Sequence, residues 1–221
     1  MLHKDRTAAG QFLAKELAAY ANRSDLLVLA LPRGGVPVAF EVAKALNAAL
    51  DIFVVRKLGV PDQPELAMGA IASGGVRVLN QDIVRSLRLT ETEISREEAK
   101  QRQELERREH LYRGNRPLPV VRGRTVIVVD DGLATGATMR AAIMALGTQQ
   151  PARLVIAVPV AAPQTCQEFE SEVDEVVCTV TPTPFYSVGL WYENFPQTSD
   201  EEVRSLLVKA AKRDRESAMH A

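Results

Sequence analysis

One segment, residues 126–138, constrains the fold more than any other part of the chain. Its apolar run Val126-Ile127-Val128-Val129 is followed directly by Asp130 and Asp131 and then by small residues up to Thr138. So short an apolar run is typical of a strand that is buried on both faces of a parallel sheet. The acidic pair and the small residues would then lie at the carboxyl end of the strand, where open α/β sheets bind their ligands. The segment therefore predicts an α/β fold with a ligand site at this strand end.

The rest of the chain alternates in the same way between apolar runs and helical patterns. The run at 26–31 ends at Pro32, and two glycines then turn the chain into a helix, as in a βαβ unit. We therefore expect a mostly parallel, twisted sheet flanked by helices, in one domain over residues 1–221, with a small hood or helical insert. The expected strands are 26–31, 52–55, 125–129, 154–158 and 175–180, and the expected helices are 8–21 (capped by Thr7), 36–46, 137–146, 164–170 and a last helix capped by Ser199 or Asp200.

Two regions depart from this alternation. Residues 57–80 mix glycine, proline and short β-prone pieces, which predicts a loop leading into a small hairpin around Gly74-Gly75. Residues 82–116 form a charged helical insert, in which the stretch 90–113 is dense in Glu, Arg, Gln and Lys. A solvated helix with ion pairs four residues apart is favoured there over a mobile arm or a subunit contact.

The charge balance excludes a broad electrostatic role. Of the 221 residues, 27 are Lys or Arg and 28 are Asp or Glu, so the net charge of −1 gives no general attraction to nucleic acid or to an anionic membrane. No segment reaches the roughly 18 apolar residues of a membrane span. The cysteines, Cys166 and Cys178, are too few and too poorly spaced for a disulfide framework or a zinc motif. We therefore expect a soluble cytoplasmic protein in which neither cysteine has a special role.

The spacing of the polar residues after the strand indicates a sugar site beside a phosphate site. The carboxylates of Asp130 and Asp131 can accept hydrogen bonds from vicinal hydroxyls and help to hold a hydrated divalent cation. The stretch Thr135-Gly136-Ala137-Thr138 offers backbone N–H groups, hydroxyls and a helix start, which together bind phosphate. A nucleotide-binding P-loop is excluded because no Gly-Lys-Ser/Thr follows, and a dinucleotide site because Gly-x-Gly-x-x-Gly is absent.

The stretch Val-Val-Asp-Asp-Gly-Leu-Ala-Thr-Gly-Ala-Thr-Met at 128–139 resembles the motif with which type I phosphoribosyltransferases bind phosphoribosyl pyrophosphate (PRPP). It is most similar to the adenine phosphoribosyltransferase form, and the resemblance extends over roughly 26–58 and 120–195. The resemblance implies that Asp130 and Asp131 contact the ribose hydroxyls and hold Mg²⁺ through water. It assigns the 5-phosphate to Ala134, Thr135, Gly136, Ala137 and Thr138.

Other stretches match the family in the expected order. Leu31-Pro32-Arg33-Gly34-Gly35-Val36 resembles the family's pyrophosphate loop, which assigns Arg33, Gly34 and Gly35 to pyrophosphate, and the alternative is a tight turn with a solvent-facing arginine. Lys57 is similar to a lysine with which relatives reach pyrophosphate. By this resemblance Arg33, Lys57, Asp130 and Asp131 would be the catalytic residues.

The base site is the part that the resemblance defines least. The stretch Pro184–Phe195 resembles the late base-binding segment of purine-type relatives, with Tyr186, Ser187 and Glu193 at the base, although aromatic clusters more often build core. The chain lacks the acid that hypoxanthine-type relatives place at Ala134. Adenine-type relatives take a glutamate from a mobile loop, and here only Glu65 is available, slightly out of place.

The expected function is Mg²⁺-dependent transfer of the phosphoribosyl group from PRPP to a nitrogenous base, with a purine favoured over a pyrimidine. A loop near 59–75 would close over the site to exclude water. The alternatives are a PRPP- or nucleotide-sensing regulator on the same fold without transferase activity, and hydrolysis or transfer on another ribose phosphate. Analogy also suggests a homodimer.

Overall fold

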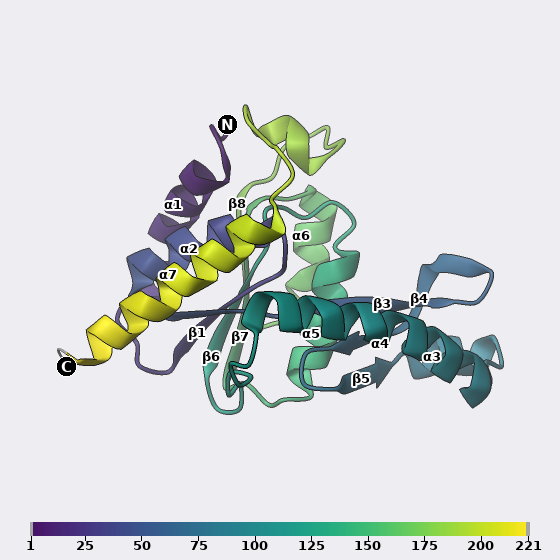
Figure 1. Ribbon diagram of the computed structural model, residues 1–221. Helices are drawn as coiled ribbons and strands as arrows, with labels where there is room; N and C mark the ends of the chain where they lie inside the picture. The colour runs from purple at the N-terminus through teal and green to yellow at the C-terminus, as the bar shows by residue number, and fades with distance from the viewer. Residues whose placement is uncertain (1, 220–221) are drawn as a thin grey trace.

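A five-stranded parallel sheet forms the centre of the computed structural model, which describes residues 2–219 apart from the side chains of Glu65 and of residues 217–219 (Figure 1). The strand order is β2-β1-β6-β7-β8, and every neighbouring pair is parallel. The strands are β1 Leu26–Ala30, β2 Ala49–Ile52, β6 Thr125–Val129, β7 Arg153–Val160 and β8 Glu175–Val180. The expected α/β fold is confirmed, although the second strand lies earlier than the predicted 52–55.

Helices cover both faces of this sheet. One side carries α1 Arg6–Glu16, α2 Gly35–Leu46 and α7 Asp200–Met219, and the other carries α5 Ala137–Gly147 and α6 Pro163–Phe169. Alternate strand residues pack on opposite layers, so that Val28 and Ile127 meet the first group while Leu29 and Val128 meet the second. Because helices bury both faces, the central strands β1 and β6 are apolar apart from Thr125.

The cap of the first helix differs from expectation, whereas the cap of the last helix is one of the two predicted residues. The side chain of Asp5, and not that of Thr7, caps α1 by accepting a 2.8 Å hydrogen bond from the N–H of Ala8. The helix then gives way to a 3₁₀ turn, η1, at Ala18–Tyr20. Ser199 caps α7, since its Oγ accepts a hydrogen bond from the N–H of Glu202 at 3.1 Å.

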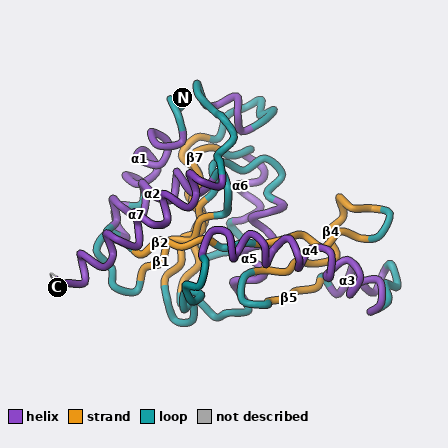
Figure 2. The backbone as a smooth tube through the Cα atoms, viewed as in Figure 1, coloured by secondary structure: helices purple, strands orange, loops and turns teal. Residues whose placement is uncertain are grey.

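Residues 55–79 form a second, antiparallel sheet where a loop was predicted. Its strands are β3 Val55–Val60, β4 Gln63–Ala72 and β5 Val76–Leu79, and the predicted hairpin at Gly74-Gly75 joins the last two. The loop part of the prediction was wrong because Gly59 and Pro64 interrupt the sequence pattern, whereas in the structure they lie together at a register shift of the β3–β4 pair. The hairpin formed by β3 and β4 projects away from α1 and α7 (Figure 2).

The charged insert folds as α3 Gln81–Ser86 and α4 Glu91–Arg113, as its composition predicted. Thr90 begins α4 with a capping box to Glu93. Ion pairs four residues apart lie along α4, and a stripe of buried residues that includes Ile94 and Leu105 packs it onto the core. The buried side chain of Arg113 anchors its end by donating to the Ile52 carbonyl at 2.8 Å.

A disulfide joins Cys166 of α6 to Cys178 of β8, so the expectation that neither cysteine has a special role was wrong. The separation of 12 residues gave no sequence signal, but α6 packs back onto β8 and brings the two Cα atoms to 6.6 Å. No helix in the described part of the chain is long and apolar enough to cross a membrane.

Candidate functional site

The candidate site lies at the carboxyl edge of the central sheet, where the turns after β1 and β6 meet. Ala30 pairs with Val129 in the strand register, so the chain leaves both strands at the same level. The N–H of Leu31 donates to the Val129 carbonyl at 2.9 Å, and the peptide bond between Pro32 and Arg33 is cis. The segments that the resemblance assigns to pyrophosphate and to ribose are therefore adjacent.

The turn after β1 contains Gly34 and Gly35 because it lies very close to the turn after β6. A Cβ atom on Gly34 would overlap Oδ2 of Asp131. A Cβ atom on Gly35 would lie 2.7 Å from the Val129 carbonyl oxygen and 2.9 Å from the Cα of Asp130. Both glycines thus make room for the acidic pair, whatever else they contact.

The acidic pair is held in a largely enclosed position. Oδ1 of Asp130 accepts a 2.8 Å hydrogen bond from the N–H of Asp131. Burial, reinforced by the charge of Asp131, raises the pKa of Asp130 well above its usual range. Burial also raises the pKa of Asp131, and the nearby Arg6 opposes that shift. Both carboxylates are therefore costly to keep ionised without a partner, which is the behaviour expected of groups that serve a ligand.

Sequence reasoning missed Arg6, whose guanidinium contacts Asp131. Its Nε donates to Oδ2 of Asp131 at 2.9 Å, and a terminal nitrogen lies 2.8 Å from the same oxygen. The other terminal nitrogen donates to the Pro196 carbonyl at 2.6 Å, and the guanidinium carbon lies 3.8 Å from the centre of the Phe195 ring. The hydroxyl of Tyr192 donates to the Asp131 carbonyl at 2.6 Å. No local motif could have identified a contact across 125 residues.

The predicted phosphate loop, residues 134–138, faces solvent at the start of α5. Ala134, Thr135, Ala137 and Thr138 are exposed, and the loop lines a pocket of about 200 Å³ together with Asp130. Gly136 has a positive φ of 69°, which is the left-handed region that favours glycine. Asp130 and this loop therefore open onto one pocket.

Helix α6 supports the phosphate loop from behind. The hydroxyl of Thr165 donates to the Ala134 carbonyl at 2.7 Å. A Cβ atom on Gly136 would lie 2.7 Å from the Phe169 ring and 2.8 Å from Thr165. The loop conformation is thus fixed by packing before any ligand binds.

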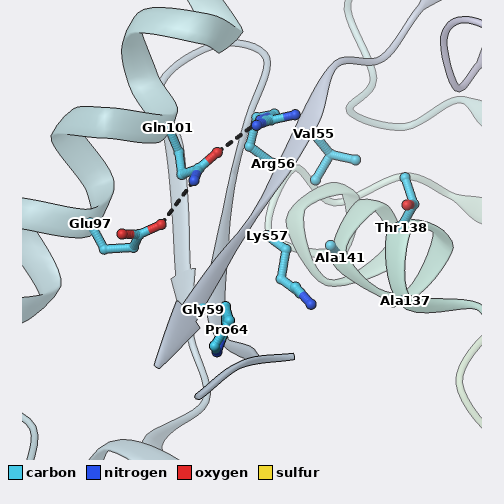
Figure 3. A pocket seen from close by; sticks show the side chains of 10 residues that line it. All are labelled: Val55, Arg56, Lys57, Gly59, Pro64, Glu97, Gln101, Ala137, Thr138 and Ala141. Carbon is cyan, nitrogen blue, oxygen red and sulfur yellow. Dashed lines mark hydrogen bonds between the residues drawn. The ribbon is translucent and has the colours of Figure 1, made fainter. Parts of the chain in front are cut away.

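The two cations assigned to pyrophosphate lie in different places. Lys57, on β3, lines a pocket of about 340 Å³ together with Ala137 and Thr138 of the phosphate loop (Figure 3). Its neighbour Arg56 donates instead to Gln101 of α4 at 2.9 Å. Arg56 and Lys57 therefore both line the pocket that borders the phosphate loop, and Nε of Arg56 is bonded to Gln101.

Arg33 faces α7. Its guanidinium lies 3.8 Å from a carboxylate oxygen of Asp200, which also accepts a 2.5 Å hydrogen bond from the hydroxyl of Tyr112. Burial, followed by this hydrogen bond, raises the pKa of Tyr112 to about 12. Arg33 thus contacts α7, whereas Lys57 lies in the pocket that borders the phosphate loop.

The segment assigned to the base borders the same edge. A Cβ atom on Gly132 would lie 2.6 Å from Val188, and Val188 lines the loop pocket. Tyr186, Ser187 and Glu193 are exposed, with Tyr186 at 79%, and their role at a base stays a prediction. The side chain of Glu65, assigned to a mobile loop, lies outside the described residues. Its backbone belongs to β4, so the loop expected at 59–75 is a hairpin.

The donor set suits a cation that is held mainly by a ligand and by water. Among the side chains that the structure describes, no group of three His, Cys, Asp or Glu residues converges as a metal cage. Mg²⁺ commonly binds through one or two carboxylates together with substrate phosphates. Asp130 and Asp131, next to the predicted phosphate loop, fit that pattern.

Comparison with known proteins agrees with this geometry. Residues 2–190 match the phosphoribosyl transferase domain. Proteins from two strains of Mycobacterium tuberculosis, each named "Putative phosphoribosyl transferase", are 49% identical over 209 residues, which is 95% of this chain and 47% of each relative. The chain therefore spans about half the length of these curated relatives.

Two solved structures are similar to this chain in fold. The crystal structure of TT1426 from Thermus thermophilus has a TM-score of 0.88 at 42% identity, covering 95% of this chain and 99% of that chain. The AQ2163 protein from Aquifex aeolicus has a TM-score of 0.51 at 14% identity, covering 92% of this chain and 86% of that chain, and it shares the fold alone.

Proposed function

The chain belongs to the phosphoribosyl transferase family, and we propose that it transfers the 5-phosphoribosyl group of PRPP to a nitrogenous base with release of pyrophosphate. The observation that carries this proposal is the meeting of an acidic pair and a supported phosphate loop at one sheet edge. Asp130 and Asp131 would accept hydrogen bonds from the ribose hydroxyls, and residues 134–138 would bind the 5-phosphate.

The chemistry that this arrangement supports is substitution at the anomeric carbon. The bond from that carbon to the pyrophosphate oxygen breaks, a bond to the acceptor nitrogen forms, and the acceptor gives up a proton. Because positive charge develops on the ribosyl ring, the carboxylates of Asp130 and Asp131 favour the transition state. Lys57 and Arg33 would bind the departing pyrophosphate. A bound Mg²⁺ would offset the negative charge of the diphosphate.

The acceptor is proposed to be a purine rather than a pyrimidine, with the adenine-type relatives as the nearest analogy. The exposed ring of Tyr186 can stack on a base, and Ser187 and Glu193 can contact its edge. We also propose that the protein is cytoplasmic and forms a homodimer.

A second candidate function is PRPP sensing without transfer. The exposure of Tyr186, Ser187 and Glu193 favours it, because the described residues build no enclosed base pocket around these side chains. Such a regulator would keep the PRPP site described above and lack turnover.

A pyrophosphate-release assay separates these functions. We expect release that requires PRPP, Mg²⁺ and a purine, and that stops when Mg²⁺ is chelated. Lys57→Ala should lower the rate by about tenfold to a hundredfold, since a charge-assisted hydrogen bond contributes about 1.5–3 kcal/mol. Lys44→Ala is the matched control, because Lys44 lies on α2 and pairs with Glu41 at 3.8 Å. If the protein binds PRPP but releases no pyrophosphate with any purine or pyrimidine as acceptor, the transferase is excluded and the sensor is favoured.

A further inference from the structure

The N-terminal segment, residues 3–6, forms part of the site in the structure although no motif placed it there. The N–H of His3 donates to the Trp191 carbonyl at 2.9 Å, and the His3 carbonyl accepts from the N–H of Glu193 at 2.8 Å. The Lys4 carbonyl accepts from the N–H of Asn194 at 3.0 Å. These backbone bonds hold the start of the chain against the segment 191–194.

Arg6 extends from this segment to the acidic pair. Its side chain is 11% exposed and that of Asp131 is 17% exposed, so the ion pair is mostly shielded from solvent. Both Nε and a terminal nitrogen contact Oδ2 of Asp131, at 2.9 and 2.8 Å, while the remaining terminal nitrogen is taken by the Pro196 carbonyl. The guanidinium plane also rests on the Phe195 ring. Each of the three nitrogens therefore has a partner and one face of the guanidinium lies on a ring, which restricts the position of the group.

We infer that Arg6 is a positioning residue of the ribose site. It fixes the Asp131 carboxylate through Oδ2, so that Oδ1 is presented to a ribose hydroxyl, and it ties this acid to the segment 191–196. This inference rests on the proposed function, and it adds a residue that the family motif does not supply.

Arg6 should affect the recognition of ribose and not the recognition of phosphate. Residues 134–138 are supported by Thr165 and Phe169 of α6, whereas Arg6 contacts Asp131, Pro196 and Phe195. Loss of Arg6 should therefore weaken ligands that contain ribose and leave binding of inorganic phosphate unchanged. A general loosening of the fold would weaken both.

The role of Arg6 is tested by calorimetric titration of the wild type, Arg6→Ala and Arg6→Lys with ribose 5-phosphate, PRPP and inorganic phosphate. We expect Arg6→Ala to weaken ribose 5-phosphate and PRPP about tenfold or more, with the affinity for phosphate unchanged. Arg6→Lys should recover part of the loss, because a lysine keeps the charge but cannot donate from several nitrogens in one plane. Phe195→Leu should cause a smaller loss in the same direction, because it removes the ring beneath the guanidinium.

The matched control is Arg153→Ala. Arg153 forms a 2.9 Å ion pair with Glu175 at the amino ends of β7 and β8, on the opposite edge of the sheet, and its loss should change no affinity. Unchanged or tighter ribose 5-phosphate binding in Arg6→Ala would overturn the inference, as would equal losses for ribose 5-phosphate and phosphate. If the wild type binds phosphate but neither ribose 5-phosphate nor PRPP, the proposed function itself fails.

Discussion

Replacing Asp130 and Asp131 together by asparagine is expected to abolish PRPP binding. Each carboxylate can accept a charge-assisted hydrogen bond from a ribose hydroxyl, and each such bond contributes about 1.5–3 kcal/mol. Loss of both corresponds to a weakening of about a thousandfold. The measurement is calorimetric titration of PRPP in the presence of Mg²⁺. PRPP binding within tenfold of wild type would contradict the assignment of ribose to this pair.

The single variant Asp130→Asn shows whether such a loss is due to unfolding. Because burial and Asp131 raise the pKa of Asp130 above its ordinary value of 3.8, the folded protein binds this proton more tightly than the unfolded chain does. The stability of the wild type should therefore fall as the pH rises above that ordinary value and through the raised pKa, and Asp130→Asn should lack this fall. Urea denaturation at neutral pH should find the single variant at least as stable as wild type. A clearly less stable variant would mean that Asp130 serves the fold.

A single methyl group at Gly34 is also expected to weaken PRPP binding, although less than the double variant does. The backbone of Gly34 has φ −60° and ψ −33°, which alanine adopts without strain, so Gly34→Ala should fold. Its Cβ atom would overlap Oδ2 of Asp131, and that carboxylate is the end of a side chain that can move away. Because displacement of one acid removes its hydrogen bond and the contact with Arg6, PRPP binding should weaken by about a hundredfold.

Gly147→Ala is the control for this prediction. No atom lies within 4 Å of a Cβ atom built at Gly147, at the end of α5, so the substitution should leave PRPP affinity unchanged. Wild-type affinity in a folded Gly34→Ala variant would show that the position of Asp131 does not control binding.

The sequence predicted the central sheet because its strands are continuous apolar runs that end at polar or glycine-rich turns. The strand Thr125–Val129 and the turn after it are the clearest case, since parallel order alone places Asp130 and Asp131 at the edge shared with Gly34. The antiparallel sheet was missed because Gly59 and Pro64 disrupt the alternation on which strand prediction depends.

Contacts between distant segments could not be predicted in this way. The pairing of Arg6 with Asp131 and the disulfide between Cys166 and Cys178 both depend on how helices pack on the sheet. At the base site the sequence predicted a role for a side chain that the structure leaves exposed. The resemblance assigned Tyr186 to the base, but the side chain of Tyr186 lies in solvent.

Titration of the unmodified protein with PRPP, with and without Mg²⁺, tests the central claim most directly. The geometry of the acidic pair and of residues 134–138 predicts saturable binding of one PRPP per chain that is markedly tighter with Mg²⁺. Absence of PRPP binding under both conditions would contradict the claim that this sheet edge is a PRPP site, and only the fold and the family membership would stand.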